Sequence, residues 1–454
     1  MRLTRRQALA GAAAGALGAA GIYELVDRFA GSTETLRRSV GRMGTEQHAL
    51  GLAVVVDEGV EVVVPPRHHQ VVTATVKESN LRQAARELED ALVALEQRYD
   101  PTTPAGLAVT IGWGLPYFRE HVSGAARVHL PHDRRAGKAA LLDSLRFPSD
   151  PDEMILEAND VAVLLRADSQ RRIAEGARAL FQDLDVFEVT SVRKGFVGGG
   201  LPKRMAKAAG VPGADLIPDG AQLFLGFTST QKDGLGPQPI ANFETLGYVD
   251  LGPKAYFRGG TSMHVSHLFE DLEAWYLNFD FRERVDTAFR PGIDVREGAK
   301  TVRQSRQDVA RTAQVASDFR NRGRIGHSSA IQTTSRLQHD VVADDGTVFR
   351  RGTAIPQRAD FNTLDNPFAW SATPGRDGMA EGARAGIHFV VFNPTSDDFH
   401  RNRLAMDGRL PDGTHLPLRP RARGQGFNSV LRTTHRQNFL VPPRRHRSFP
   451  LAEL

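Results

Sequence analysis

The strongest constraint on the fold is an order of strand-like and helix-like segments that occurs twice in the first half of the chain. In each occurrence, a strand-like alternation is followed by apolar residues at helical spacing and then by a second strand-like run. The three segments lie at 71–76, 81–95 and 107–113 in the first occurrence and at 161–165, 173–181 and 186–192 in the second. A repeated β-α-β order with an insertion is typical of a ferredoxin-like α+β domain, in which helices cover one face of an antiparallel sheet.

The second half of the chain repeats this theme more loosely. A buried strand is expected at 386–393, a polar helix at 303–318, and strand-like runs at 222–227, 261–267 and 438–441. We therefore expect two similar α+β halves, with a cleft or cavity between the sheet and the long insertions.

Composition limits the chemistry of any functional site. The 454 residues are 41% hydrophobic and 24% charged, so the chain has enough apolar material for a core. It contains no cysteine, which excludes disulfides, thiol nucleophiles, zinc ribbons and iron–sulfur clusters. A metal would have to be held by His, carboxylate, Tyr or Met. The net charge is only +5, and we expect no nucleic-acid partner.

The N-terminus predicts an export signal. Arg5 and Arg6 stand directly before an uncharged, Ala- and Gly-rich run that extends to Ile22, as in twin-arginine (Tat) signals. We assign residues 1–30 to this signal and residues 31–69 to a linker or surface segment. The Tat export machinery is then a partner, and the destination is the cell envelope or the extracellular space. After residue 30 no apolar stretch reaches the roughly 20 residues of a membrane span, so contact with a membrane would require an uncleaved signal.

Several further segments, each weak alone, occur in one order over about residues 70–445. They are Ala108–Gly114, Asp160–Asp168, Gly195–Gly199, Leu216–Phe227, Phe257–Trp275, Phe349–Gly352, Phe389–Asn393 and Asn438–Pro443. In this order they resemble the characteristic strands and motifs of the dye-decolourising (DyP-type) haem peroxidases. The resemblance implies an α+β fold of two ferredoxin-like halves, similar to a dimeric α/β barrel, with antiparallel sheets and long insertions. The halves would be an N-terminal domain at 70–200 and a C-terminal domain at 201–454 that carries the haem site.

The resemblance also implies a cofactor and a reaction. Members of the family bind haem b, whose iron is ligated by a histidine of the C-terminal half, and they use hydrogen peroxide to oxidise an organic donor. The Asp of a G-x-x-D-G motif and the first Arg of an R-R-G motif face the bound peroxide. The chain would accordingly be an exported haem-dependent peroxidase whose electron donor the sequence does not identify.

The family's site residues carry over to individual positions. His327 is the candidate iron ligand because it precedes Arg350 by 23 residues, near the family's spacing, and His339 is the substitute. Arg350 or Arg351 is the candidate for the peroxide side, where a fixed guanidinium stabilises developing negative charge. Gly195 and Gly199 fall in the glycine-rich segment that would approach the cofactor.

One departure from the family pattern bears on the activity. Gly198 stands where the family has the Asp of G-x-x-D-G, and glycine has no side chain that accepts a proton. The alternative interpretation is therefore a non-catalytic protein of the same fold that binds or delivers haem or another ligand. A secreted structural protein without a cofactor is the third possibility.

Overall fold

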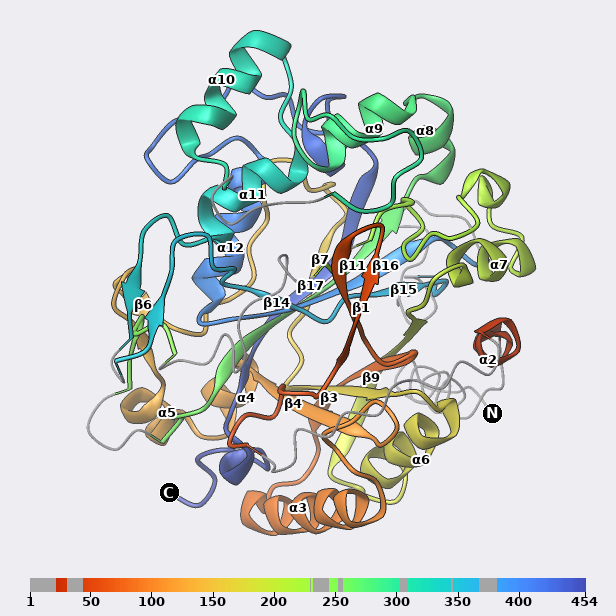
Figure 1. Ribbon diagram of the computed structural model, residues 1–454. Helices are drawn as coiled ribbons and strands as arrows, with labels where there is room; N and C mark the ends of the chain where they lie inside the picture. The colour runs from red at the N-terminus through yellow and green to blue at the C-terminus, as the bar shows by residue number, and fades with distance from the viewer. Residues whose placement is uncertain are drawn as a thin grey trace.

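The computed structural model describes residues 22–30, 44–228, 230–231, 245–251, 256–302, 309–343, 346–366 and 382–454. Its centre is a closed ring of antiparallel strands (Figure 1). The ring strands are β3 (His68–Val76), β4 (Ala108–Gly114), β8 (Val161–Ala167), β9 (Phe187–Phe196), β11 (Thr261–Glu270), β15 (Phe361–Thr363), β16 (Gly386–Asn393) and β17 (Leu431–Val441).

The ring closes because β11 pairs with two neighbours. The order is β11-β16-β15-β9-β3-β8-β4-β17, and β17 pairs back onto β11 from Thr261↔Val441 to Glu270↔Leu431. The first four ring strands of the chain come from residues 68–196 and the other four from 261–441. The predicted α+β fold of two ferredoxin-like halves is confirmed. The exact domain boundaries remain predictions.

Two helices cover the N-terminal half of the ring. Helix α3 (Leu81–Arg98) begins after Asn80, whose side chain accepts a hydrogen bond from the backbone N–H of Gln83, as a helix N-cap does. Its apolar face packs with that of α6 (Gln170–Phe181) against the outer face of β3 and β8. Both helices match the apolar spacing predicted from the sequence. The short helices α4 (Leu115–Glu120) and α5 (Ser123–His129) follow β4.

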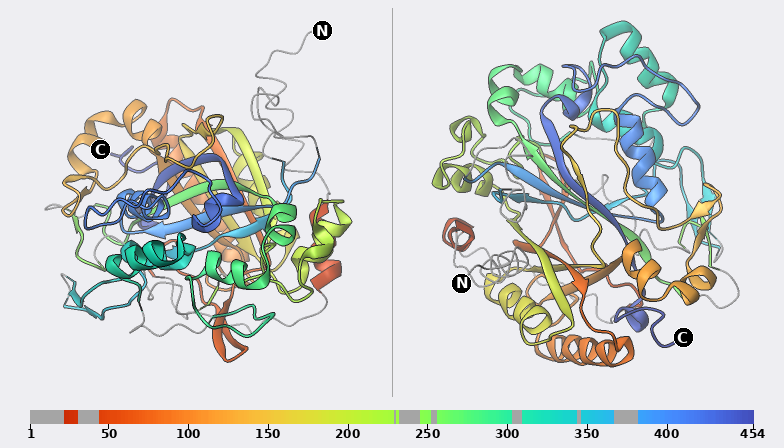
Figure 2. Two further views of the ribbon diagram at one scale, coloured as in Figure 1. Left: turned by 90° about the horizontal axis from the view of Figure 1, so that it is seen from above. Right: turned by 180° about the vertical axis from the view of Figure 1, so that it is seen from behind.

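Most helices of the C-terminal half lie on the side of the ring away from α3, while α7 (Leu201–Ala208) lies at the edge of the molecule beside the N-terminal arm (residues 22–30), as Figures 1 and 2 show. The others are α8 (Leu272–Leu277), α9 (Phe281–Ala288), α10 (Thr312–Arg322), α11 (His327–Ser335) and α12 (Ser396–Met406). Capping boxes fix the start of two of them, through Asp280 and Glu283 in α9 and through Thr395 and Asp398 in α12.

The N-terminal arm, residues 22–30, is part of the folded body. It consists of η1 (Ile22–Glu24) and α2 (Leu25–Ala30). Val26 is fully buried, and the Tyr23 hydroxyl donates a hydrogen bond of 2.7 Å to Asp365 Oδ1. The last nine residues of the predicted 1–30 signal thus belong to the packed structure, whereas residues 1–21 lie outside the described residues.

Two sequence expectations for the second half differ from the structure. The alternating run 222–227 contains no strand, because Phe224, Leu225 and Phe227 all enter one hydrophobic cluster with Trp275 instead of pairing along a ladder. The helix predicted at 303–318 begins at Thr312 and ends at Arg322. Residues 303–308 lie outside the described residues.

The remaining strands and 3₁₀ turns are short, apart from one hairpin. They are β1 (Ala53–Asp57) and β2 (Val60–Val64), which pair as that hairpin, and β5 (His132–Asp133), β6 (Lys138–Ala139), β7 (Ile155–Leu156), β10 (Val249–Asp250), β12 (Val341–Val342), β13 (Val348–Phe349), β14 (Gln357–Arg358), η2 (Ala214–Leu216), η6 (Gly426–Ser429) and η7 (Arg444–His446). Within the described ranges, no helix is both long and apolar enough to cross a membrane.

Candidate functional site

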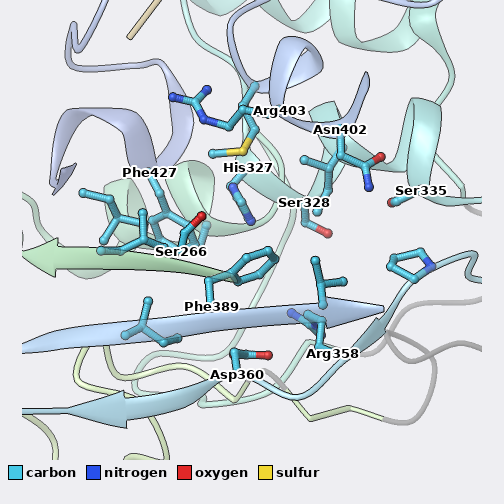
Figure 3. Close-up of a pocket in the computed structure, with 18 of the residues that line it drawn as sticks. Ser266, His327, Ser328, Ser335, Arg358, Asp360, Phe389, Asn402, Arg403 and Phe427 are labelled. Atoms are coloured by element: carbon cyan, nitrogen blue, oxygen red, sulfur yellow. The ribbon is translucent and has the colours of Figure 1, made fainter. Parts of the chain in front are cut away.

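A cavity of about 250 Å³ lies between the C-terminal half of the ring and the helices that cover it (Figure 3). Its sheet side is made by alternate residues of neighbouring strands, because successive side chains of a strand point to opposite faces. They are Ser266, Leu268 and Glu270 of β11 and Ile387, Phe389 and Val391 of β16. Helices α11 and α12 and turn η6 supply the other side. The lining is mostly apolar, as in small-molecule sites.

His327 enters this cavity as the first residue of α11. Gly326 permits this placement, because a Cβ there would lie 2.3 Å from the carbonyl oxygen of Phe289. That same carbonyl accepts a hydrogen bond of 2.9 Å from the Ser329 N–H. The start of the helix is therefore held tightly against the end of α9.

The His327 imidazole is neutral, and one of its ring nitrogens is not used in a hydrogen bond. Its Nδ1 is buried and has no hydrogen-bond partner, and the ring centroid lies 4.7 Å from that of Phe427. Burial, with smaller contributions from Arg358 and Arg403, lowers its pKa to about 3. A buried nitrogen without a partner is costly, and a neutral imidazole in this state is a suitable metal ligand.

A polar group of side chains lies on the strand side of the cavity. In the view of Figure 3, Arg358 and Asp360 lie on the other side of the Phe389 ring from His327. The two residues are two positions apart at the end of β14, so both line the cavity, while Ala359 between them packs into the apolar interior of the ring.

Glu270 is the third member of this polar group. Its side chain lines the cavity at the end of β11, the residue is 3% exposed, and its Oε2 has no hydrogen-bond partner. Burial and the nearby charge of Asp360 raise its pKa to about 8. Glu270 is thus protonated at neutral pH.

A buried ion network closes the cavity near α12. Arg436 donates a 2.7 Å hydrogen bond to Asp150, and Arg403 donates a 3.0 Å hydrogen bond to Asp407. Arg403 also lies 3.4 Å from the same Asp150 oxygen. These charges are paired, so the network gives this wall a fixed shape.

The structure separates the predicted site residues. His327 lines the cavity, whereas Arg350 and Arg351 are not among the described residues that do so. The Arg350 side chain is 71% exposed and donates a 2.6 Å hydrogen bond to Asp340. Arg351 donates from its backbone N–H to the same carboxylate. His339 is exposed.

The predicted glycine positions also lie outside the described cavity lining. Gly195 sits in β9, where a Cβ would lie 2.1 Å from the carbonyl oxygen of Asn362. Gly199 lies three residues after the end of that strand, in the turn before α7. Gly198 has φ +156°, and a Cβ there would meet the side chain of Leu201 at 2.7 Å. The functional roles predicted for these glycines, for Arg350 and for Arg351 are therefore still untested predictions.

Sequence reasoning missed Arg358, Asp360 and Glu270. The signal for the first two is present, since Arg and Asp stand at i and i+2 of an extended segment and must share a face. For Glu270 the alternation Ser266, Leu268, Glu270 along a strand gives the face. It does not show that a cavity lies above that face.

Within the described part of the chain, no group of three or more His, Asp or Glu residues is placed to hold a metal ion. His327 alone could supply one ligand to a metal. A planar cofactor with one axial histidine is compatible with this single ligand.

Comparison with solved structures shows which proteins have a similar fold. A protein from Shewanella oneidensis assigned as a DyP-type peroxidase aligns with a TM-score of 0.52 and 13% sequence identity, over 89% of this chain and 98% of that chain. The encapsulated DyP-type peroxidase from Mycobacterium smegmatis aligns at 0.49 and 14% identity, over 85% and 95%. A DypB variant from Rhodococcus jostii RHA1 in complex with heme aligns at 0.48 and 14%, over 89% and 98%. The chain is thus similar in fold to the DyP-type peroxidases.

Comparison of the sequence gives the family. No curated protein matches the chain. The profile of a family described as "Family of unknown function (DUF7405)" matches residues 66–443, which span the whole ring and the cavity. The chain therefore belongs to the DUF7405 family.

Proposed function

We propose that this protein binds haem b in the cavity of His327 and uses hydrogen peroxide to oxidise an organic donor that is still to be identified. The observation that carries the proposal is the buried His327 Nδ1 without a partner at the edge of an apolar cavity. The DyP-type fold supports the same conclusion.

The residues that line the cavity are of the chemical kinds that hold haem. The volume of about 250 Å³ is below the ~300–1,000 Å³ of ligand pockets, so haem loading requires the lining side chains to move apart. Four arginines and three carboxyls line the cavity, and with Glu270 protonated two carboxylates remain, Asp150 and Asp360. Asp407 lies outside the lining but pairs with Arg403, so four positive charges minus three negative charges leave +1, a net positive charge that favours the anionic propionates of haem b.

Individual residues of the cavity would have different roles in haem binding. His327 would ligate the iron, Phe389 and Phe427 would exclude water, and the lining arginines other than Arg358 would attract the propionates. When bound, haem supplies the redox chemistry. The protein contributes the axial ligand, the orientation and the local electrostatics.

A second function has one specific observation in its favour. Arg350 is exposed and paired with Asp340 instead of lining the cavity, and Gly198 has no carboxylate. A haem-binding protein that stores or delivers the cofactor without peroxidase activity would have the same His327 site and would need neither residue.

Export by the Tat route is part of the proposal. Tat carries folded proteins, and a chain without cysteine does not depend on an oxidising compartment to fold. The protein would act in the cell envelope or outside the cell, with membrane contact only through an uncleaved signal. Replacing both Arg5 and Arg6 by Lys should leave folded protein in the cytoplasm; unchanged secretion would contradict a Tat signal.

Titration of the haem-free protein with hemin tests the haem site. The wild type should develop a Soret band that saturates at one haem per chain. His327→Ala should lose the tight phase, because the axial bond is the one coordinate link between protein and a b-type haem. His339→Ala is the matched control and should bind as the wild type does. Equal binding by His327→Ala and the wild type would contradict the proposed ligand.

A further inference from the structure

Glu270 is a carboxyl whose burial the fold does not explain. It is 3% exposed, its Oε2 has no hydrogen-bond partner, and it is the last residue of β11. Burying a carboxyl without partners costs several kcal/mol in the charged form, so the group stays protonated instead. An apolar side chain of similar volume would fill the position at lower cost.

The position of Glu270 aims it at the contents of the cavity. It follows Ser266 and Leu268 on the face of β11 that lines the cavity, and its backbone N–H is already used by the carbonyl oxygen of Ala385. The backbone hydrogen bond therefore fixes the position of Glu270, while its side chain makes no hydrogen bond that the fold requires.

Two titratable groups act on this carboxyl or are acted on by it, and one arginine lines the same cavity. Asp360 raises the pKa of Glu270 through its charge, and Arg358 lines the same cavity two positions earlier in the chain. Tyr276 of α8 is close enough for Glu270 to raise its pKa. The Tyr276 hydroxyl donates to the carbonyl oxygen of Phe224, so it is not a donor to Glu270. Glu270 can thus change its protonation state without breaking a hydrogen bond.

We propose that Glu270 is the proton-exchanging carboxyl of this cavity and that Arg358 is the fixed counter-charge for the anion its action creates. Ionised Glu270 takes the proton of an O–H group of bound peroxide and becomes a carboxylic acid. The peroxide oxygen keeps the electron pair of the broken O–H bond, and its negative charge is stabilised by the Arg358 guanidinium. The acid then returns the same proton to the second oxygen of the peroxide, so the step moves one proton between the two oxygens and leaves the total number of protons and the total charge unchanged.

This assignment gives the cavity the group that the sequence lacks at position 198. The assignment rests on the proposed function for its substrate, peroxide. The protonation state of the Glu270 carboxyl does not depend on that function. A base with a pKa near the operating pH is the most effective proton-transfer group. The shift that burial and Asp360 impose on Glu270 brings it into that range.

The first experiment uses the haem-free protein and needs no activity. The infrared carbonyl band of a protonated carboxyl is followed from pH 5 to pH 10, and the spectrum of Glu270→Gln is subtracted. One carboxyl should titrate near pH 8 in the wild type. In Asp360→Asn, which keeps Glu270, the same band should titrate at lower pH because a like charge is gone. Glu273→Gln, which removes an exposed carboxyl three residues on, should leave the band unchanged. A Glu270 that titrates near its ordinary value would overturn the assignment.

The second experiment uses the haem-loaded protein and hydrogen peroxide. The bimolecular rate of the wild type should rise with pH to a plateau above about pH 8. Glu270→Gln should lower the plateau by about 10²-fold, the low end for general acid–base catalysis, and remove the pH-dependent limb. Arg358→Leu should lower the rate while keeping the limb.

The two proposals fail in distinguishable ways. If hemin does not bind but the Glu270 band titrates near pH 8, the proposed function is wrong and the raised pKa of Glu270 is confirmed. If hemin binds through His327 and Glu270→Gln reacts with peroxide at the wild-type rate and pH profile, the role of Glu270 is overturned and haem binding stands.

Discussion

Arg350 donates a 2.6 Å hydrogen bond to Asp340, and this ion pair holds its guanidinium at the protein surface. The pair joins the end of the short hairpin of β12 and β13 to the segment before it. The arginine that sequence resemblance places on the peroxide side is therefore engaged elsewhere, and Arg358 is the arginine that faces His327 across the cavity.

Replacing each of these two arginines by leucine should affect the peroxide rate differently. Arg350→Leu should keep the haem content and the peroxide rate of the wild type, because an exposed ion pair contributes at most about 1 kcal/mol. Arg358→Leu should lower the peroxide rate by about 10²-fold, the magnitude for loss of one preorganised donor. Stopped-flow mixing of the haem-loaded variants with peroxide measures both. A loss confined to Arg350→Leu would restore the role expected from sequence.

Restoring an aspartate at position 198 should not create a better peroxidase. Gly198 has φ +156°, and its Cβ would point at Leu201 instead of the cavity. Gly198→Asp should destabilise the fold by roughly 1–3 kcal/mol without raising the peroxide rate. Gly210→Asp is the control, because Gly210 has a positive φ of +67° with open space around it. A faster reaction in Gly198→Asp would place this loop at the reaction site.

The stability of the haem-free protein should depend on pH through Glu270. Its folded pKa of about 8 lies above the ordinary value of 4.5. The unfolded chain therefore releases this proton first, and stability is fully present below about pH 4.5 and falls as the pH rises through 8. Urea unfolding at pH 5, 7 and 9 should show the free energy of unfolding of Glu270→Gln rising relative to that of the wild type, by about 4 kcal/mol between pH 5 and pH 9. A difference that does not change with pH would contradict the raised pKa.

The N-terminal arm should stabilise the folded chain. The Tyr23 hydroxyl donates to Asp365 at 2.7 Å and accepts the N–H of Leu364 at 2.9 Å, while Val26 is fully buried. A chain that begins at residue 31 should unfold at lower urea than one that begins at residue 22. Tyr23→Phe in the longer chain should account for about 1–3 kcal/mol of the loss, the cost of leaving buried polar groups unpaired. Equal midpoints for the two chains would show that the arm is dispensable.

The fold was predictable where the sequence pattern depends on one face of one element. The spacing of Leu88 and Leu92 predicted α3, and the alternation of 261–267 predicted β11. In each case the buried residues recur with the period of the element itself. The run 222–227 has the alternation of a strand but no partner strand. Its aromatic residues are buried by Trp275, which lies about 50 residues away in the chain.

The candidate site was predictable only in part, for a related reason. His327 was found through its place between recognisable segments, and the structure puts it in the cavity. Arg350 and Arg358 are both arginines near the same strands, and the sequence does not show which one Asp340 holds at the surface. That choice is made by a contact between chain segments, and neither periodicity nor motif spacing reports it.

The absorption spectrum of the protein, isolated from cells that are supplied with a haem precursor, shows whether the His327 cavity holds haem. The account predicts a Soret band with close to one haem per chain in the wild type and in His339→Ala, and its loss in His327→Ala at unchanged folded yield. Folded wild-type protein that is isolated without a Soret band, and that develops none on addition of hemin, would contradict the account.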